Sequence, residues 1–246
     1  MHWGGVSDPF QPCEAKFRNS YECLKVFAET GYPFVFSTKG RLVAEPEYLE
    51  LLKRCNAVGQ ISAVCDRYDR IEPGAPTFAE RLEMMRRLAP NVRRLIVRIQ
   101  PYMHEVKSDV LANLERFAEA GAYGVIIEGM KFEKAKPGLV KVGGDFAYPY
   151  KVLEDDFREI SQTAHRLGLK CYAGENRLRV NGYGDSLTCC GCDDLEGFRG
   201  NSYNLVHICN GEAPEPTSAM TMPATGNCFS ALYQSTDAGR FCRQQS

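Results

Sequence analysis

The first residues whose types and spacing suggest chemistry lie in the opening stretch MHWGGVSDPFQPCE. Gly4 and Gly5 allow the backbone to approach a ligand closely, while Ser7 and Asp8 add a hydroxyl and a carboxylate. Glu14 follows near the positive end of a predicted helix. A ligand with an ammonium group would meet two carboxylates and unpaired backbone groups here. For the two glycines alone, the simpler interpretation is a strand-to-helix turn that Asp8 caps.

A second group with metal-binding chemistry is the cysteine-rich tail, which contains SLTCCGCDDLEGF. The candidate metal ligands are Cys189, Cys190, Cys192, Cys209 and Cys228, with His207 close by. Thiolates crowded this closely favour zinc or an iron–sulfur cluster, although Cys-Cys-x-Cys is not a standard zinc-knuckle spacing. The alternative is that some of these cysteines are buried apolar side chains and the others are idle thiols.

The overall composition excludes several classes of protein. The 246 residues carry 30 basic and 31 acidic side chains, so no global positive field favours a nucleic-acid partner. No run of about 18 apolar residues predicts a membrane span, and the N-terminus has no signal pattern. An odd count of 11 cysteines without a signal peptide argues against a secreted disulfide framework. We therefore expect a cytoplasmic protein.

The elements that must position these residues alternate between strands and helices. Short apolar runs predict strands at 1–6, 33–39, 57–64, 92–101, 123–129 and 169–173. One helical face is predicted from Phe17, Tyr21, Leu24 and Ala28, and others from Phe78, Leu82 and Met85, from Leu111, Leu114 and Ala118, and from Phe157, Ile160, Ala164 and Leu167. Thr77 and Glu80 form a predicted capping box, while Gly121 and Gly168 are predicted helix stops.

A repeat of strand and helix predicts an α/β fold with a parallel sheet, either doubly wound or part of a (β/α) barrel. Active sites of both lie where the strands end, which makes Glu128, Glu175, Asn176 and His104 candidates for the rim. Glu128 is a candidate for ligand contact, and His104 is either a proton donor or a polar rim side chain. Residues 130–150 are predicted to be an insertion or lid, in which Tyr148 and Tyr150 would cover a ring or fasten the loop.

The opening stretch, STKG and QIS occur in one order along the chain, followed by EPGAPTFAERLEMMRRL and VRIQP. In this order and spacing the sequence resembles the radical S-adenosylmethionine enzymes, most closely the branch related to spore photoproduct lyase. The resemblance implies a 4Fe–4S cluster, a 5′-deoxyadenosyl radical and an electron donor such as a flavodoxin or ferredoxin. The implied cofactor-binding residues are Gly4, Gly5, Ser7, Asp8, Lys39, Ser62 and Arg98, to which Glu14 and Glu128 are added as candidates from their positions at a helix start and a strand end. Arg81 matches less closely and is expected to cap the surface of its helix.

The sequence departs from this family at its defining motif. The spacing Cys-x-x-x-Cys-x-x-Cys, which holds the cluster in the family, does not occur in these residues. The resemblance therefore implies an incomplete (β/α)6 barrel, with the family's second to sixth strands and one extra, over residues 1–173. Residues 174–246 are expected to be an irregular cysteine-rich extension that holds a second cluster or zinc.

Three functions remain open at this point. The first is a radical enzyme that cleaves S-adenosylmethionine reductively, with an unknown substrate; lesion repair in nucleic acid follows only from the branch and has no support from the charge. The second is a non-catalytic or remnant metal-binding protein with a truncated barrel, which the missing cluster motif favours. The third is a conventional (β/α) enzyme acting on a phosphate or an amino acid, which does not explain the specific order of motifs.

Overall fold

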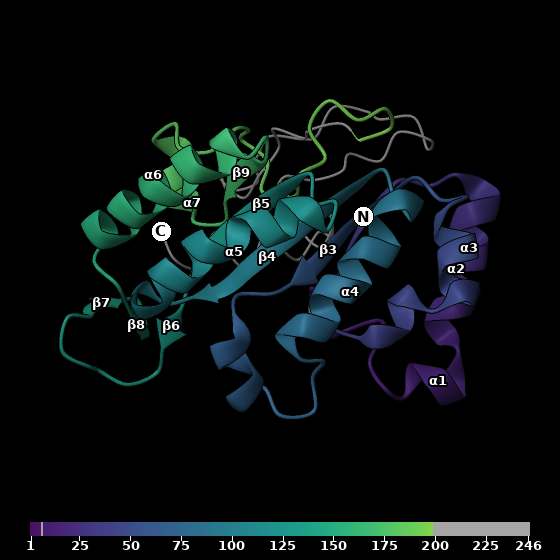
Figure 1. Ribbon diagram of the computed structural model, residues 1–246, viewed down its shortest axis with the longest axis horizontal. Coiled ribbons are helices and arrows are strands. Elements are labelled where there is room, and N and C mark those ends of the chain that lie inside the picture. The colour runs from purple at the N-terminus through teal and green to yellow at the C-terminus, as the bar shows by residue number, and fades with distance from the viewer. Residues whose placement is uncertain (6, 199–246) are drawn as a thin grey trace, which may run out of the picture.

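The computed structural model describes residues 1–5 and 7–198, which form an α/β fold around one main sheet (Figure 1). Its strands are β1 (His2–Trp3), β2 (Phe34–Thr38), β3 (Ala57–Ser62), β4 (Arg94–Tyr102), β5 (Gly124–Gly129) and β9 (Lys170–Ala173). All neighbours are parallel, in the order β1-β2-β3-β4-β5-β9. The predicted α/β fold and parallel sheet are confirmed, and the six apolar runs are these strands. Within the described residues the sheet is open, with β1 and β9 at its two edges.

One face of the sheet is covered by helices. The helices are α1 (Glu14–Phe17), α2 (Asn19–Thr30), α3 (Pro46–Leu52), α4 (Phe78–Leu88), α5 (Lys107–Glu119), α6 (Tyr150–Arg166) and α7 (Asn176–Val180). Short 3-10 turns lie at η1 (Arg41–Ala44), η2 (Asp66–Arg70), η3 (Ala89–Asn91) and η4 (His104–Val106). In Figure 1, α4, α5 and α6 lie side by side in front of the strands, as right-handed crossovers require.

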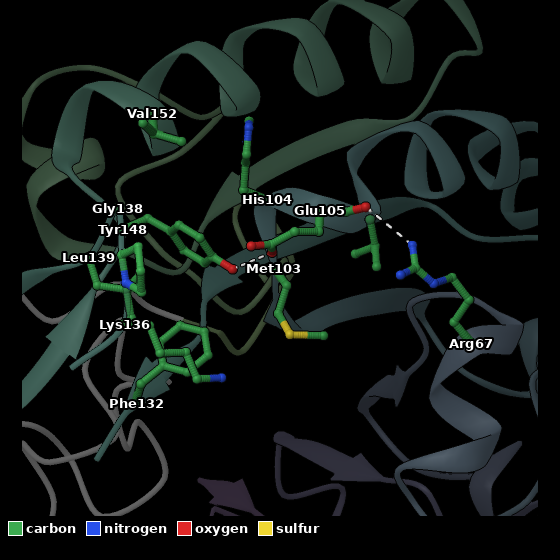
Figure 2. A pocket seen from close by; sticks show the side chains of 12 residues that line it. Arg67, Met103, His104, Glu105, Phe132, Lys136, Gly138, Leu139, Tyr148 and Val152 are labelled. Carbon is green, nitrogen blue, oxygen red and sulfur yellow. Dashed lines mark hydrogen bonds between the residues drawn. The ribbon is translucent and has the colours of Figure 1, made fainter. Parts of the chain in front are cut away.

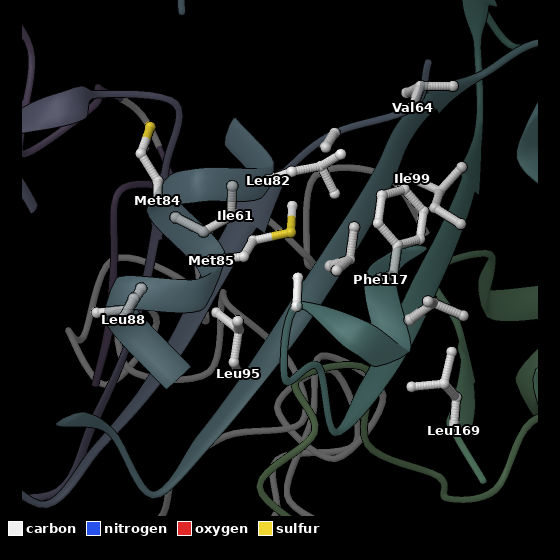
Figure 3. Close-up of a cluster of buried hydrophobic side chains, with 14 of the residues drawn as sticks. Ile61, Val64, Leu82, Met84, Met85, Leu88, Leu95, Ile99, Phe117 and Leu169 are labelled. Atoms are coloured by element: carbon white, nitrogen blue, oxygen red, sulfur yellow. The ribbon is translucent and has the colours of Figure 1, made fainter. Parts of the chain in front are cut away.

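The main core lies between this face and the helices (Figure 3). Ile61 on β3 and Ile99 on β4 are completely buried, and they belong to one cluster with Met85 of α4 and Phe117 of α5. Each such side chain contributes about 1.5–3 kcal/mol when it leaves water. Because successive strand residues point to opposite faces, the alternate residues of the same strands must line the second face of the sheet.

The second face has an apolar part and a polar part. The apolar part consists of Val35, Val58, Ile96, Ile126 and Tyr172, packed against Cys190, Cys192 and Phe198 of the following segment. Two residues further along β2, β4 and β5 stand Ser37, Arg98 and Glu128, and Gln60 is two residues beyond Val58 on β3. The change from apolar to polar comes toward the carboxyl ends of the strands, where ligands bind in parallel sheets.

Two helix ends that the sequence predicts are confirmed, and one predicted helix is divided. The capping box of α4 between Thr77 and Glu80 is formed, and Gly168 follows α6 with φ of +76°. The helix predicted from Phe17 to Ala28 is confirmed for Tyr21, Leu24 and Ala28, which lie in α2, and is wrong for Phe17. Arg18 adopts a left-handed conformation with φ of 53°, which separates α1 from α2 and leaves Phe17 exposed on the surface.

The predicted insertion at 130–150 contains a small sheet of its own. Its strands are β6 (Lys131–Phe132), β7 (Val140–Val142) and β8 (Asp145–Ala147), in the antiparallel order β6-β8-β7. The sequence did not predict these strands because they are only two or three residues long and have little apolar alternation. In Figure 1 this small sheet lies beyond the carboxyl ends of β4 and β5.

The described part of the predicted extension packs directly on the main sheet. The backbone N–H of Cys171 on β9 donates to Asp185 Oδ2 at 2.7 Å, and Gln60 Nε2 donates to the carbonyl of Cys190 at 3.1 Å. Arg94 Nη1 donates to the carbonyl of Gly191 at 3.1 Å. No helix within residues 1–5 and 7–198 has the length and apolar character needed to cross a membrane.

Candidate functional site

Polar side chains from several strands meet on the second face of the sheet, and we call them the polar layer. They are His2, Ser37, Gln60, Arg98, Gln100 and Glu128. Arg98 lies at their centre: its Nη1 donates to Ser37 Oγ and to Gln60 Oε1, both at 3.1 Å. Its Nη2 donates to Gln100 Oε1 and lies 3.7 Å from Glu128 Oε2. The guanidinium is therefore held in a fixed orientation at the end of the sheet.

The parallel register explains why these side chains meet. Ser37 on β2 is directly opposite Gln60 on β3, and Ser37 Oγ donates to Gln60 Oε1 at 2.7 Å. On the edge strand, His2 Nε2 lies 2.8 Å from the same Ser37 hydroxyl. Burial, together with the positive charge of Arg98, lowers the pKa of His2 to about 4. Ser37 and Gln60 were not predicted as site residues, although a glutamine inside the apolar run AVGQISAV was a usable signal.

Two carboxylates lie at the end of β5, and one of them, Glu128, stands beside Arg98. Glu128 is 30 % exposed, and burial raises its pKa above the ordinary value, while Arg98 acts in the opposite direction. Glu175, which follows β9, also favours the protonated form of Glu128, and its own Oε1 accepts the backbone N–H of Gly129 at 3.1 Å. The site thus combines the guanidinium of Arg98 with the carboxylates of Glu128 and Glu175, of which Glu128 contacts the guanidinium and Glu175 accepts a backbone N–H.

The raised pKa of Glu128 leads to a pH prediction. A raised carboxyl pKa means that Glu128 stabilises the fold fully below its unfolded value of 4.5, and that this contribution is lost as the pH rises through the folded pKa. We expect Glu128→Gln to increase the free energy of unfolding relative to wild type at pH 8, and the gain to shrink toward pH 4.5. Urea unfolding of both proteins at a series of pH values measures this difference in the free energy of unfolding.

The control is Glu115→Gln, which makes the same substitution at an exposed position of α5 away from the polar layer. A Glu128→Gln protein that is less stable than wild type at pH 8 would contradict the prediction. It would mean that the attraction between Glu128 and Arg98 outweighs the cost of burying the carboxylate.

The opening turn lies against the end of β2. Gly4 has φ of +98°, and a Cβ there would lie 2.3 Å from the carbonyl oxygen of Ser37, so glycine is required. Gly5 has no neighbour within 4 Å of such a Cβ, and Ser7 is exposed. The two glycines therefore differ: the first allows β1 to approach β2, and the second leaves open backbone.

Asp8 is held by protein donors from two segments. Its Oδ1 accepts the N–H of Phe10 at 2.8 Å and the hydroxyl of Thr38 at 2.6 Å. Its Oδ2 accepts the backbone N–H groups of Lys39 at 2.7 Å and of Gly40 at 3.1 Å. Asp8 thus fastens the opening turn to the residues after β2, as well as capping its own turn.

A chain of charged groups continues from this corner. Lys39 Nζ contacts Glu72 Oε1 at 2.5 Å, and Arg81 Nη2 contacts Glu72 Oε2 at 2.6 Å. Burial alone would raise the pKa of Glu72, but these two hydrogen bonds lower it below its ordinary value. A cavity of about 490 Å³ adjoins this corner, with Asp8, Lys39 and Arg41 in its wall.

Arg81 and Glu14 have different surroundings from those that the sequence predicts. The expectation that Arg81 caps a helix surface is wrong, because Arg81 is buried and donates to the carbonyls of Ser62 and Pro76. Glu14 is also buried, on the helix side, where its carboxylate accepts the N–H groups of Ser20 and Tyr21 at the start of α2. Glu14 therefore lies apart from the polar layer, while Ser62 pairs with Arg98 in the register of β3 and β4.

Three of the candidate metal ligands lie among the described residues. Cys190 and Cys192 are buried in the apolar part of the second face, and burial raises the pKa of Cys192 to about 11. Cys189 is half-buried, with its Sγ 3.7 Å from Cys190 Sγ. Within residues 1–5 and 7–198, no three His, Cys, Asp or Glu side chains are arranged to hold a metal ion. The other candidates, Cys209, Cys228 and His207, lie outside the described residues, so the metal site stays a prediction.

Comparison with known proteins gives a result for the fold alone. No family model matches the chain, and no curated protein matches it. Among solved structures, the chain is similar to a domain of pyruvate-formate lyase-activating enzyme from Bacteroides vulgatus ATCC 8482, at 17% sequence identity and a TM-score of 0.49. The similarity covers 71% of this chain and 98% of that domain. At this identity and TM-score, the comparison assigns neither a family nor a function.

Proposed function

We propose that the chain binds S-adenosylmethionine at the polar layer and is a radical S-adenosylmethionine-type protein of the spore photoproduct lyase branch. The observation that carries the proposal is the Arg98–Glu128 pair, with 3.7 Å between guanidinium and carboxylate, at the carboxyl end of a parallel sheet. It is supported by the order of motifs in the sequence, from the opening turn to Lys39 and Ser62.

The chemistry of the ligand fits the charges of this site. S-adenosylmethionine carries a carboxylate, an ammonium group and a sulfonium. The guanidinium of Arg98 suits the carboxylate because it is positively charged and is held in place by the hydrogen bonds of its Nη1 to Ser37 and Gln60. Glu128 and Glu175 attract the cationic groups, and this attraction is stronger in a half-buried site than in water. Gly5 leaves open backbone that a ligand can approach, whereas Gly4 is packed against β2.

The 4Fe–4S cluster that the resemblance implies requires three cysteine ligands. The described residues do not bring three such ligands together, so we assign no step of a reaction to a cluster in this part of the chain. When such a cluster is present, it supplies the electron that cleaves S-adenosylmethionine. The role of the described residues is then to bind and orient the ligand and to exclude water from it.

Isothermal titration calorimetry with S-adenosylmethionine tests the proposal. We expect binding by the wild-type chain, and an affinity at least tenfold lower for Arg98→Gln, because a charge-assisted bond to the carboxylate is lost. S-adenosylhomocysteine, which lacks the sulfonium charge, should bind more weakly than S-adenosylmethionine to wild type. The difference in affinity between the two ligands should be smaller for Glu128→Gln.

The control is Arg93→Gln, which removes an exposed arginine just before β4 without touching the polar layer. It should bind S-adenosylmethionine as wild type does. The proposal fails if the folded wild-type chain binds neither ligand, or if Arg98→Gln binds S-adenosylmethionine with unchanged affinity.

A non-catalytic metal-binding protein is the alternative, and the thiols of Cys189 and Cys190, 3.7 Å apart, are the observation that favours it. Anaerobic addition of iron and sulfide, and separately of zinc, distinguishes the two functions. Zinc binding without a cluster absorption band and without S-adenosylmethionine binding would favour the alternative. Loss of zinc in Cys189→Ser would place the site in this segment.

The remaining parts of the proposal rest on the resemblance alone. They are a flavodoxin or ferredoxin as electron donor and a nucleic-acid lesion as substrate; the proposed cytoplasmic location rests instead on the composition. The net charge of −1 gives no support to the nucleic-acid substrate. The substrate is therefore left open.

A further inference from the structure

A second cavity, of about 480 Å³, lies outside the polar layer and shares no lining residue with it (Figure 2). It is enclosed by η4, by the small sheet of the insertion and by the first turns of α6. Its apolar lining residues are Met103, Val106, Phe132, Leu139, Tyr148 and Val152. Its polar side chains are Arg67, His104, Glu105 and Lys136. A mostly apolar cavity with a few polar groups is the ordinary form of a small-molecule site.

His104 at this cavity is oriented by a buried carboxylate. Asp156 of α6 is 2 % exposed, and its Oδ2 lies 2.6 Å from His104 Nδ1. The same oxygen accepts the hydroxyl of Tyr102 at 2.8 Å, and Lys107 Nζ lies 3.4 Å from Oδ1. A carboxylate that accepts Nδ1–H fixes the imidazole tautomer and leaves Nε2 as the hydrogen-bonding atom. The His104 side chain is 47 % exposed and can therefore reach a ligand.

Two aromatic rings form the wall of the cavity. Phe132 and Tyr148 meet edge to face, with centroids 5.6 Å apart at 81°. The hydroxyl of Tyr148 donates to Glu105 Oε2 at 2.5 Å, which Figure 2 marks, so the Tyr148 ring is fixed. Burial and this hydrogen bond raise the pKa of Tyr148, which keeps its hydroxyl neutral. Rings fixed in this way favour a planar, aromatic ligand over a flexible one.

A positive charge stands at the edge of the same wall. Lys136 Nζ lies over the Phe132 ring, 4.8 Å from its centroid, and its positive charge helps to lower the pKa of Glu105 without a direct ion pair among the described residues. Arg67, the other cation of the lining, is paired with Asp109 at 3.2 Å. Lys136 is therefore less engaged than Arg67, and an anionic group beside the aromatic wall would complement its charge.

We propose that this cavity binds a small planar aromatic anion, with its ring against Phe132 and Tyr148, its anionic group toward Lys136 and a hydrogen bond to His104 Nε2. The site is separate from the polar layer and does not depend on binding of S-adenosylmethionine. His104 and Lys136 bind the ligand, and Asp156 is a positioning residue that acts through His104.

The test uses 8-anilinonaphthalene-1-sulfonate, an aromatic anion whose fluorescence increases on binding, and N-phenyl-1-naphthylamine, its neutral counterpart. Wild type should bind the anion. Lys136→Gln should lower the affinity for the anion about threefold and leave the affinity for the neutral dye unchanged, because only the charge is removed. Phe132→Ala should lower the affinity for both dyes about tenfold. Lys134→Gln, an exposed lysine of the same loop, is the matched control and should change neither.

A second measurement follows His104 directly. With ¹⁵N-labelled histidine, addition of the anionic dye should shift the His104 Nε2 resonance of wild type and not that of His165. The proposal is overturned if wild type does not bind the anion, if Lys136→Gln and Lys134→Gln bind it equally, or if the His104 resonance does not move. Titration of the same variants with S-adenosylmethionine should give wild-type affinity, so a failure here is separate from a failure of the proposed function.

Discussion

Replacement of Asp156 by alanine is expected to lower the free energy of unfolding by about 3–5 kcal/mol, the cost of removing one partner from a buried charged network. Three donors would lose an acceptor: the Tyr102 hydroxyl, His104 Nδ1 and Lys107 Nζ. Tyr102 is completely buried, so water cannot replace Asp156 there. Burial, with the hydrogen bond to Asp156, raises the pKa of Tyr102, and its hydroxyl therefore stays a donor.

Urea unfolding followed by circular dichroism measures this loss, and the preceding residue gives the control. Asp155 on the same helix is 52 % exposed and pairs with Lys151 at 2.9 Å, so Asp155→Ala should cost less than about 1 kcal/mol. Asp156→Asn keeps the shape of the side chain and one acceptor oxygen. Its loss in the free energy of unfolding should lie between those of Asp155→Ala and Asp156→Ala. Equal losses for Asp155→Ala and Asp156→Ala would contradict the idea that the network stabilises the fold.

The Asp156 network also shows where prediction from sequence reaches its limit. The pattern Phe157, Ile160 and Ala164 correctly predicts the buried face of α6. Asp156, one residue earlier, is buried because Tyr102 and His104 reach it from the end of β4, over 50 residues away in sequence. Periodicity describes one element at a time, so it cannot report a partner on another element.

The strands were predictable for a local reason. The inner strands β2 to β5 are largely buried, so the centres of runs such as VRRLIVRIQP are apolar. The charged or polar residue inside such a run was the signal for the site. Arg98 was a candidate through the resemblance alone, whereas the meaning of Ser37 and Gln60 depends on the register between β2 and β3, which the sequence pattern does not contain.

Burial of Arg81 and the break at Arg18 have the same explanation. A helical pattern alone predicts an exposed Arg81, but Glu72 and two backbone carbonyls satisfy its guanidinium in the interior. Arg18 leaves the helical conformation while its side chain forms a two-pronged pair with Glu47 of α3, at 2.8 and 2.9 Å. Both depend on contacts between elements, which single-sequence patterns do not contain.

Replacement of Gly40 by alanine is the other change with a large expected effect. A Cβ on Gly40 would lie 2.0 Å from the carbonyl oxygen of Phe10 and 2.5 Å from its carbon. These are backbone atoms, and the Phe10 ring is 1 % exposed and packed against Phe36 and Tyr48, so neither side can move aside cheaply. We expect a loss of about 3 kcal/mol in the free energy of unfolding.

The matched control is Gly5→Ala in the opening turn, where a Cβ meets nothing within 4 Å and the loss should be within about 0.5 kcal/mol. Thermal unfolding by calorimetry compares the two. The same displacement would pull the Gly40 N–H away from Asp8 Oδ2, 3.1 Å distant, and so loosen the carboxylate that joins the opening turn to β2. Gly40→Ala should therefore also weaken binding of S-adenosylmethionine, if the opening turn must approach the ligand. If the Gly40→Ala protein is destabilised but binds S-adenosylmethionine with wild-type affinity, the hydrogen bonds that hold the opening turn are not needed for binding.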